Sequence, residues 1–250
     1  MIMETKMTPK DRIAENLKRI QDRIAEACAR SRRETKEVQL VAVTKMEDVD
    51  SITALLELGC TDLGESRAQD FITKYEQVNV WLQERQRLNL SAVAPHWHMI
   101  GHLQRNKVKP LLQKVCMIHS VDSLRLAEEI NTNAARQGLN DKVRILLEVN
   151  TGEEKEKYGL AVGAVIPLAE IVRELPNLEI VGLMTMAPLT DDKDLCRFCF
   201  VRLRELFEEI RGKNICGPGF RHLSMGMSQD YDVAVEEGAT LVRIGSALFA

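Results

Sequence analysis

The chain has 250 residues, 45% hydrophobic and 28% charged, which is ordinary globular usage and excludes a disordered tail, a collagen and a coiled coil. Lys plus Arg number 34 and Asp plus Glu number 37, so the net charge of −3 provides no general attraction to nucleic acid or to an anionic membrane. No apolar run approaches the ~18 residues of a membrane-spanning helix, and Met1–Lys10 is too polar for a secretory signal. We therefore expect a cytoplasmic protein without nucleic-acid or membrane partners.

The first predicted element is an amphipathic helix over Pro9–Arg32. Apolar residues recur there at steps of three and four, from Ile13 to Ala27, which is the period of one helix face. We expect residues 1–37 to form an N-terminal helical segment that precedes the main fold of residues 38–250.

Eight short, mostly apolar strands follow. They are predicted at Val38–Val43, Cys60–Leu63, Trp97–Ile100, Met117–Val121, Val143–Val149, Ile180–Met186, Arg221–Met225 and Leu241–Ile244. Helices are predicted between them at Asp48–Leu58, Arg67–Gln77, Ser123–Arg136, Ala164–Glu174, Asp194–Gly212 and Tyr231–Glu237. The polar stretch Val80–Pro95 is expected to be an insertion on the exterior.

The alternation of these elements predicts the fold. Strands with unbroken apolar runs are typical of a parallel sheet that is buried on both faces. Alternating strands and helices with right-handed crossovers give an α/β fold. Eight such repeats fit a closed (β/α)8 TIM barrel better than an open doubly wound sheet, which is the structural alternative. No linker rich in Pro, Gly or Ser divides the sequence, so we expect residues 1–250 to form a single domain.

The six cysteines indicate reduced thiols, because they are scattered along a chain without a secretory signal. Cys196 and Cys199 form a C-x-x-C within the predicted helix Asp194–Gly212. That spacing also suits two small apolar residues on one helix face, and no second ligand pair for zinc stands out. We expect these two cysteines to pack in the core, and we expect no metal.

The residues after the strands have the composition of a functional site. In barrel enzymes the active site lies at the carboxyl ends of the strands. Those positions here are rich in glycine and polar groups, unlike the strands themselves: Lys45, Gly64-Glu65-Ser66, Gly101-His102, Ser120 to Asp122, Asn150, Met184 to Met186, Ser224 to Gly226, and Arg243 to Ser246.

The ends of the seventh and eighth strands predict a phosphate site. Gly226 and Gly245 let the backbone approach an anion without a Cβ in the way, and Ser224 and Ser246 add hydroxyl donors. The alternative is that both glycines only form tight turns.

Lys45 is the candidate nucleophile, because a lysine in a partly dry site beside another cation attacks carbonyl groups. Arg243 could be that cation, and it could also hydrogen-bond a ring nitrogen. Together with a phosphate site, this set suggests pyridoxal phosphate (PLP) held as a Schiff base. A lysine-dependent aldolase acting on sugar phosphates fits nearly as well.

Two further groups are weaker candidates. His96, His98 and His102 lie around the third strand, but no carboxylate at matching spacing completes a metal site. The methionines at the strand ends, including Met184, are expected to pack the barrel mouth.

Nine motifs in register resemble the pyridoxal-phosphate homeostasis proteins, whose barrel is like the N-terminal domain of alanine racemases. The resemblance covers residues 38–249. Its motifs are Leu40 to Lys45, Gly64-Glu65-Ser66, Trp97 to Gln104, His119 to Ser123, Glu148-Val149-Asn150, Lys157-Tyr158-Gly159, Gly182 to Met186, Leu223 to Ser228, and Val242 to Gly245.

The resemblance implies a role for each site residue. Lys45 would carry PLP as an internal aldimine, and Arg243 would face the pyridine nitrogen. The other residues that it implies are Ser224, Gly226, Gly245 and Ser246 at the phosphate, with Asn150, Met184, Ile100 and His102 lining the pocket. The family motif Gly-Glu-Asn is Gly-Glu-Ser here, so Ser66 replaces an amide that would reach the cofactor.

The resemblance implies a binding protein for intracellular PLP homeostasis that buffers the cofactor or delivers it to apo-enzymes. The alternative is a PLP-dependent amino-acid racemase of narrow or weak activity. A racemase commonly needs an acid/base opposite the lysine, and none of the three tyrosines has a clear claim to that face. A third possibility is an interaction regulator that the cofactor only stabilises. Since the usual racemase dimer surface has no counterpart here, we expect a monomer or a weak dimer.

Overall fold

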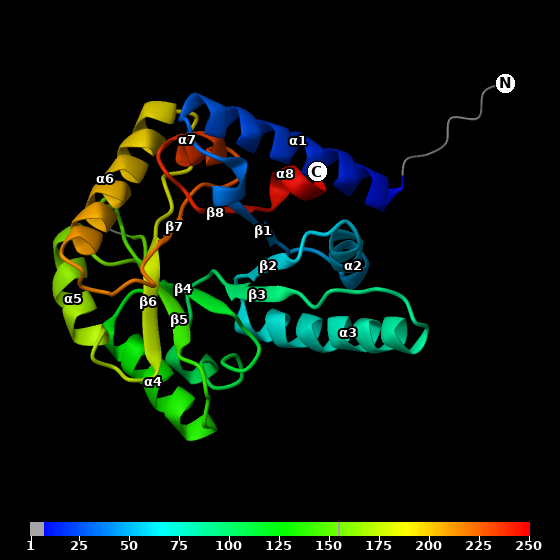
Figure 1. The fold of residues 1–250 in the computed structure, drawn as a ribbon, viewed down its shortest axis with the longest axis horizontal. Helices are drawn as coiled ribbons and strands as arrows, with labels where there is room; N and C mark the ends of the chain where they lie inside the picture. The colour runs from blue at the N-terminus through cyan, green and yellow to red at the C-terminus, as the bar shows by residue number, and fades with distance from the viewer. Residues whose placement is uncertain (1–7, 155) are drawn as a thin grey trace.

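The computed structural model describes residues 8–154 and 156–250, and it is a closed barrel of eight parallel strands (Figure 1). The strands are β1 Gln39–Val43, β2 Asp62–Glu65, β3 His96–Met99, β4 Met117–Val121, β5 Val143–Glu148, β6 Leu178–Met184, β7 His222–Ser224 and β8 Leu241–Ile244. Each strand pairs with the next, and β8 pairs with β1 from Gln39 opposite Leu241 to Ala42 opposite Ile244. The predicted (β/α)8 barrel is therefore confirmed, and the open sheet is excluded.

Helices surround the barrel. They are α1 Pro9–Arg30, α2 Val49–Glu57, α3 Ala68–Arg87, α4 Leu124–Gln137, α5 Val165–Val172, α6 Lys193–Gly212, α7 Tyr231–Glu236 and α8 Ser246–Phe249, with 3-10 turns η1 Thr35–Glu37, η2 Arg105–Lys107 and η3 Val162–Ala164. Between β3 and β4 the chain forms η2 and further turns instead of an α-helix. Over residues 8–154 and 156–250, no helix is both long and apolar enough to cross a membrane.

The N-terminal helix α1 packs across α7 and α8, at the end of the chain (Figure 1). Thr8 and Asp11 form a capping box at its start, and Ile13, Ile20 and other residues of one face are buried. Asn16 donates 3.0 Å hydrogen bonds from its side-chain amide to the backbone carbonyls of Leu248 and Ala250. The helix thus closes one side of the barrel and fixes the C-terminal turn.

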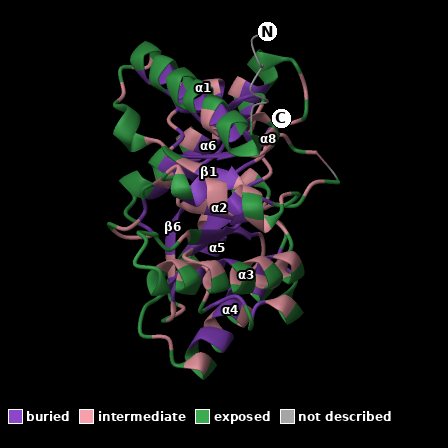
Figure 2. Ribbon diagram, turned by 90° about the vertical axis from the view of Figure 1, so that its right-hand side faces the viewer, coloured by how far each residue is buried: buried purple, intermediate pink, exposed green. Residues whose placement is uncertain are grey.

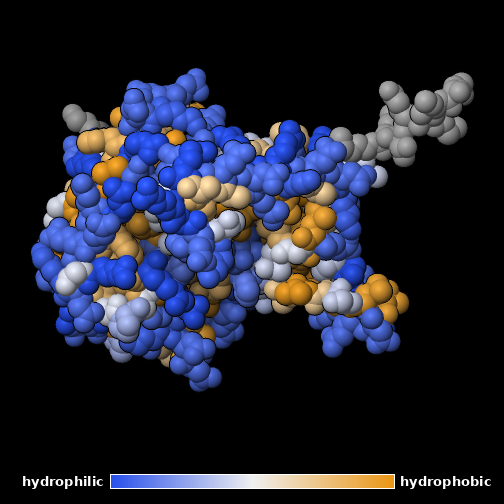
Figure 3. All heavy atoms as spheres, turned by 45° about the horizontal axis from the view of Figure 1, so that its top comes forward, coloured by the Kyte–Doolittle hydropathy of each residue, from blue (hydrophilic) through white to orange (hydrophobic). Residues whose placement is uncertain are grey.

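The helix α3 is longer than predicted. It continues through the stretch expected to be an external insertion and ends at Arg87, because Val78 is fully buried and Trp81 packs against the core. The chain then turns at Asn89, which has a φ of +55°. The far end of α3 and the following loop project from the barrel and carry exposed apolar side chains (Figure 3).

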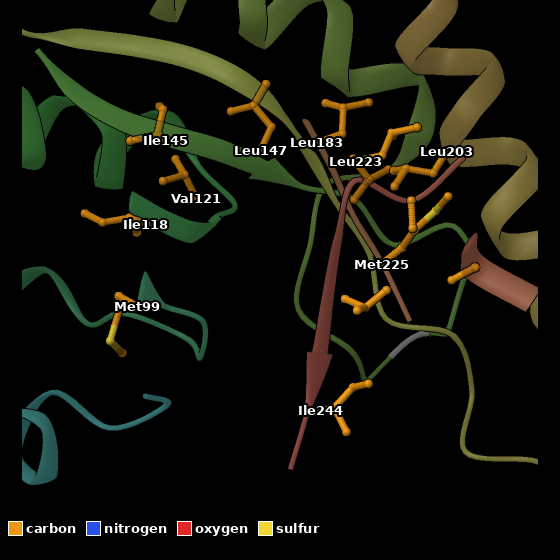
Figure 4. Close-up of a cluster of buried hydrophobic side chains, with 14 of the residues drawn as sticks. Met99, Ile118, Val121, Ile145, Leu147, Leu183, Leu203, Leu223, Met225 and Ile244 are labelled. Atoms are coloured by element: carbon orange, nitrogen blue, oxygen red, sulfur yellow. The ribbon is translucent and has the colours of Figure 1, made fainter. Parts of the chain in front are cut away.

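The main core lies between the strands and the helices. The strands are mostly buried, except at their amino ends, and the helices expose their outer faces (Figure 2). Outward-facing side chains of successive strands, such as Leu147, Leu183 and Leu223, lie side by side and meet Leu203 of α6 (Figure 4). Cys196 and Cys199 belong to this layer, so their predicted packing role is confirmed.

The interior of the barrel differs from this layer. Only part of it is apolar, in a small cluster formed by Val41, Met117, Leu146, Val181, Met184 and Leu241. The rest of the interior is occupied by polar side chains from β2, β3, β4, β7 and β8.

Candidate functional site

A cavity of about 380 Å³ opens at the carboxyl ends of the strands, where the fold predicts the active site. Its wall brings together six of the predicted residues: Lys45, Ser66, Ile100, Arg243, Gly245 and Ser246. A wider hollow of about 820 Å³ lies at the other end of the barrel, near the start of β5. None of the predicted site residues lines that second hollow, so the chemistry concentrates in the first.

Lys45 lies two residues after the end of β1, next to a buried ionic cluster. Thr44 donates its hydroxyl to Glu65 at 2.6 Å, and the Lys74 ammonium donates to Glu65 at 2.8 Å and to the Thr44 carbonyl at 2.6 Å. These hydrogen bonds hold Thr44 in place and so fix the backbone immediately before Lys45. Lys74 comes from α3, and nothing in the local sequence indicates that it reaches this point.

Arg243 is the buried cation of the site, with 3% of its surface exposed. Its guanidinium donates from Nη1 to Ser224 Oγ at 2.6 Å and from Nη2 to the Thr185 carbonyl at 2.9 Å. Burial lowers its pKa to about 10, with the charges of Glu148 and Asp230 opposing that effect, so Arg243 stays cationic at neutral pH. Two of its five N–H groups are used, which leaves others for a ligand.

Ser224 lies beneath the cavity rather than in its wall. It is fully buried, accepts a hydrogen bond from Arg243 and lies 2.9 Å from His119 Nδ1. Its predicted contact with phosphate stays a prediction. Ser228 lines the cavity in its place, and its hydroxyl accepts the Ala247 N–H at 3.2 Å. The signal was present in the motif Leu223 to Ser228, which ends on this serine.

Gly226 is required by the backbone rather than by a ligand contact. Its φ is +94°, and a Cβ there would lie 2.6 Å from the Ala234 Cβ. Its carbonyl accepts the Arg243 N–H at 2.9 Å, so the turn after β7 is attached to β8. Its predicted contact with phosphate also stays a prediction. Gly245 does line the cavity, and a Cβ there would press on Val43 at 3.2–3.3 Å.

The three remaining predicted residues lie outside the cavity wall. Asn150 donates its side-chain amide to the Glu154 carbonyl at 2.8 Å and so holds its own loop. Met184 is fully buried in the apolar part of the barrel interior. His102 stacks on Tyr158 at 3.9 Å between ring centroids. Their roles as pocket residues therefore stay predictions.

Glu148 is a buried acid that appears in one of the nine motifs but to which no role was assigned from the sequence. It is 3% exposed, and one carboxylate oxygen has no hydrogen-bond partner among the described residues. Burial raises its pKa to about 7; the Asp122 charge adds to this effect, and Arg243 opposes it. Acids with perturbed pKa values often mark functional sites. Glu148 interacts electrostatically with Arg243, which lines the cavity.

The donor set of the cavity fits a flat anionic ligand. Lys45 and Arg243 supply positive charge, and Ser228 and Ser246 supply hydroxyls. Ile100 and Met186, with other apolar side chains, supply walls against which a ring could lie. Within the described part of the chain, no group of three His, Cys, Asp or Glu side chains could hold a metal ion.

Comparison with known families decides the relationship. Residues 10–250 match the family model described as alanine racemase, N-terminal domain. The chain belongs to this family. Among curated relatives named pyridoxal phosphate homeostasis protein, the one from Aquifex aeolicus is 41% identical and covers 94% of this chain and 96% of its own length. The human relative is 34% identical over 93% of this chain and 84% of its own length. The resemblance expected from the motifs is confirmed.

Solved structures of similar proteins agree with the barrel. A protein from Bifidobacterium adolescentis described as unknown has a TM-score of 0.86 at 34% identity and covers 99% of this chain and 97% of its own. PipY from Synechococcus elongatus, solved with PLP bound, has a TM-score of 0.74 at 31% identity and covers 91% and 100%. An alanine racemase from Clostridium difficile, at 14% identity and a TM-score of 0.68, shares the fold over 95% of this chain and 56% of its own.

Proposed function

We propose that this protein binds PLP and serves its intracellular homeostasis, buffering the cofactor or delivering it, with little or no catalysis. The observation that carries the proposal is the cavity in which a lysine after β1, a buried arginine on β8 and the Ser/Gly turns after β7 and β8 meet. The PLP bound in the PipY structure, and the names of relatives 30–41% identical over most of the chain, support it.

In this proposal Lys45 supplies the amine that bonds the cofactor, and Arg243 directs a remaining N–H at the pyridine nitrogen. Ser228, Ser246 and the backbone at Gly245 hold the phosphate, since they lie together in the cavity wall. Ser66 lines the same wall, where its short hydroxyl replaces the expected amide.

The residues present fit the group. The cavity volume lies within the range of small-molecule sites, about 300–1,000 Å³. The two serine hydroxyls and the turn at Gly245 match the phosphate, Lys45 and Arg243 match the aldehyde and the ring nitrogen, and the apolar walls match the ring. When bound, PLP supplies an aldehyde that condenses reversibly with amines and a ring that draws electrons from the attached carbon.

Two features favour a carrier over a racemase. A cation at the ring nitrogen disfavours protonation of that nitrogen, which makes the cofactor a weaker electron sink. Racemisation also needs a second acid/base opposite the lysine. Besides Lys45 and Arg243, the only ionisable side chain among the described residues of the cavity wall is Asp230, whose carboxylate accepts the Met227 N–H at 2.5 Å.

The cellular setting belongs to the same proposal. We place the protein in the cytoplasm, where its six free cysteines would stay reduced. We propose apo-enzymes that use PLP as recipients, and a monomer or weak dimer as the working form.

An absorption spectrum with borohydride reduction tests the function. Purified protein should take up PLP, turn yellow, and after reduction carry the pyridoxyl mass on the peptide of Lys45. Lys45→Ala should lose both signals, and the exposed Lys36→Ala serves as the matched control. A colourless protein that takes up no added PLP, or an unchanged pyridoxyl mass after Lys45→Ala, would contradict the proposal.

A further inference from the structure

A continuous line of polar side chains crosses the barrel interior behind the cavity. Arg243 donates to Ser224 Oγ at 2.6 Å, Ser224 Oγ lies 2.9 Å from His119 Nδ1, and His119 Nε2 lies 2.9 Å from His98 Nδ1. His98 Nε2 lies 3.2 Å from Asp62 Oδ1. These five residues are called the polar chain below.

The polar chain connects the two ends of the barrel. Arg243 lines the cavity at the carboxyl ends of the strands, whereas Asp62 opens β2 opposite His96, the first residue of β3. The members between them are almost fully buried: Ser224 and His119 at 0% and His98 at 2% exposed. A barrel interior is ordinarily filled with branched apolar side chains, so a buried polar line of this length requires an explanation.

The two ends fix the direction of every hydrogen bond. Arg243 can only donate, and the Asp62 carboxylate can only accept. A neutral His98 that donates from Nε2 to Asp62 must accept at Nδ1 from His119 Nε2. A neutral His119 must then accept at Nδ1 from the Ser224 hydroxyl, whose oxygen accepts from Arg243. All four bonds therefore point from Arg243 toward Asp62, with both histidines as Nε2–H tautomers.

The electrostatics agree with this assignment. Burial, and then the charges of His98, Arg243 and His222, hold the pKa of His119 well below its ordinary value, so His119 is neutral. Burial opposes ionisation of Asp62, but hydrogen bonds from His98 and Gln39 and the charges of His98 and His96 hold its pKa below its ordinary value. The polar chain thus has a cation at one end, a carboxylate at the other and a neutral His119 between them.

We propose that Asp62, His98 and His119 are positioning residues that hold the Arg243 guanidinium toward the cavity, acting through Ser224. The ligand assignment rests on the proposed function, whereas the arrangement of the polar chain does not. These hydrogen bonds fix the guanidinium against the attraction of two carboxylates, Glu148 and Asp230, which would otherwise draw Arg243 away from a ligand.

The first test needs no cofactor. Long-range 1H–15N NMR of the histidine rings, assigned with His98→Gln and His119→Gln, should show both rings neutral with the proton on Nε2. The Arg243 Nη signals should be split by hindered rotation in the parent protein and averaged in His119→Phe or Asp62→Asn. An imidazolium or an Nδ1–H ring in the polar chain, or Arg243 signals that both variants leave unchanged, would overturn the proposal.

The second test measures binding of PLP and of its carbocyclic analogue, in which C–H replaces the ring nitrogen. His119→Phe should weaken PLP about tenfold and Asp62→Asn about threefold, because each loosens one charge-assisted hydrogen bond at the nitrogen. Neither variant should change binding of the analogue. His96→Gln is the matched control, because His96 is exposed and contacts Asp62 outside the line to Arg243.

The outcomes separate the two proposals. Equal losses for PLP and the analogue would show that the variants only damage the fold, and no loss would show that Arg243 needs no hold; either result overturns the positioning role. If the parent protein binds neither compound, the proposed function fails, and the ring tautomers and Arg243 rotation still decide the polar chain. Should His119→Phe fail to fold, Asp62→Asn decides both tests from the more exposed end of the polar chain.

Discussion

The two faces of the same strands carry different chemistry. On the outer face, Ile118, Leu223 and Ile244 join the continuous apolar layer beneath the helices (Figure 4). One residue along on β4, or one back on β8, the side chain points into the barrel and is His119 or Arg243. The outer layer gives the barrel its stability, whereas the inner line prepares one cation for a ligand.

The difference follows from the free-energy change of burying each kind of side chain. Burying an apolar side chain is favourable in proportion to its area and needs no particular partner. Burying a polar group is costly unless every donor and acceptor is paired, so each member of the polar chain depends on its neighbours. Substitutions in the outer layer should therefore lower stability in proportion to the apolar area that they remove. Substitutions in the polar chain should instead disrupt the particular hydrogen bonds that orient Arg243.

The largest expected effect is on the outer layer. Leu183→Ala should lower the free energy of unfolding by about 2–5 kcal/mol, because it removes fully buried methyl groups and leaves a cavity. PLP binding by the folded variant should not change. Urea unfolding followed by circular dichroism measures it, with the half-exposed Ile171→Ala as the control. A Leu183→Ala protein that is as stable as its parent would show that the outer layer does not give the barrel its stability.

Glu148 should give the barrel interior a pH dependence of its own. Its pKa is raised in the fold to about 7 from 4.5, so its contribution to stability is present below about pH 4.5 and is lost as the pH rises through 7. Glu148→Gln should therefore be more stable than the parent above pH 7, by on the order of 2–3 kcal/mol, and similar at pH 4.5.

Unfolding measured across pH 4.5–8.5 checks this. His119 acts in the opposite sense, because its pKa is depressed and its contribution is lost as the pH falls below about 6.5. His119 is present in both proteins, so its contribution cancels when the free energy of unfolding of the parent is subtracted from that of Glu148→Gln. A difference that does not vary with pH would rule out a protonated Glu148.

Substitutions of Ser224, which ends β7, and of Ser228, which follows it, should separate effects on stability from effects on PLP binding. Ser224→Ala removes one buried hydrogen-bond partner from each of Arg243 and His119 and should cost about 1–3 kcal/mol of stability. Ser228→Ala should cost under about 1 kcal/mol of stability, yet weaken PLP binding about tenfold if it donates to the phosphate. Thermal unfolding and PLP titration on both variants measure the two effects. Equal binding by Ser228→Ala and the parent would return the phosphate role to Ser224.

The smallest effect is expected on the solvent-exposed side of the helices. The ion pair between Lys213 and Glu209 joins half-exposed side chains four residues apart on α6 and at its end. Lys213→Ala should change stability by about 0.5 kcal/mol or less, and added salt should erase the difference. A loss above about 1 kcal/mol would mean that surface charge contributes more to this barrel than its outer layer suggests.

The sequence predicted much of the fold because the strands alternate with helices in a repeating pattern. Local signals placed the strands to within a few residues and found the buried face of α1. They failed on α3, where Val78 and Trp81 gain their burial from packing that no local pattern displays. Tertiary contacts extended that helix through a stretch whose polarity alone predicted an exposed insertion.

The candidate site divides in the same way. The rule that barrel sites lie at strand ends drew attention to Lys45, Ser66, Arg243, Gly245 and Ser246, and the structure brings these residues together in one cavity wall, while their binding roles stay predictions. That rule depends only on where strands stop, which composition reveals. Lys74 was missed because its partner Glu65 lies across the gap between β2 and α3.

The sequence by itself determined the order of the elements, the closed barrel that they form and the end of the barrel that carries chemistry. Only the tertiary structure decided which inward side chains meet. The bonds of the polar chain join residues 36, 21, 105 and 19 positions apart. Alternation along a strand tells which face a residue occupies, but the stagger between strands, set when the barrel closes, decides its neighbours.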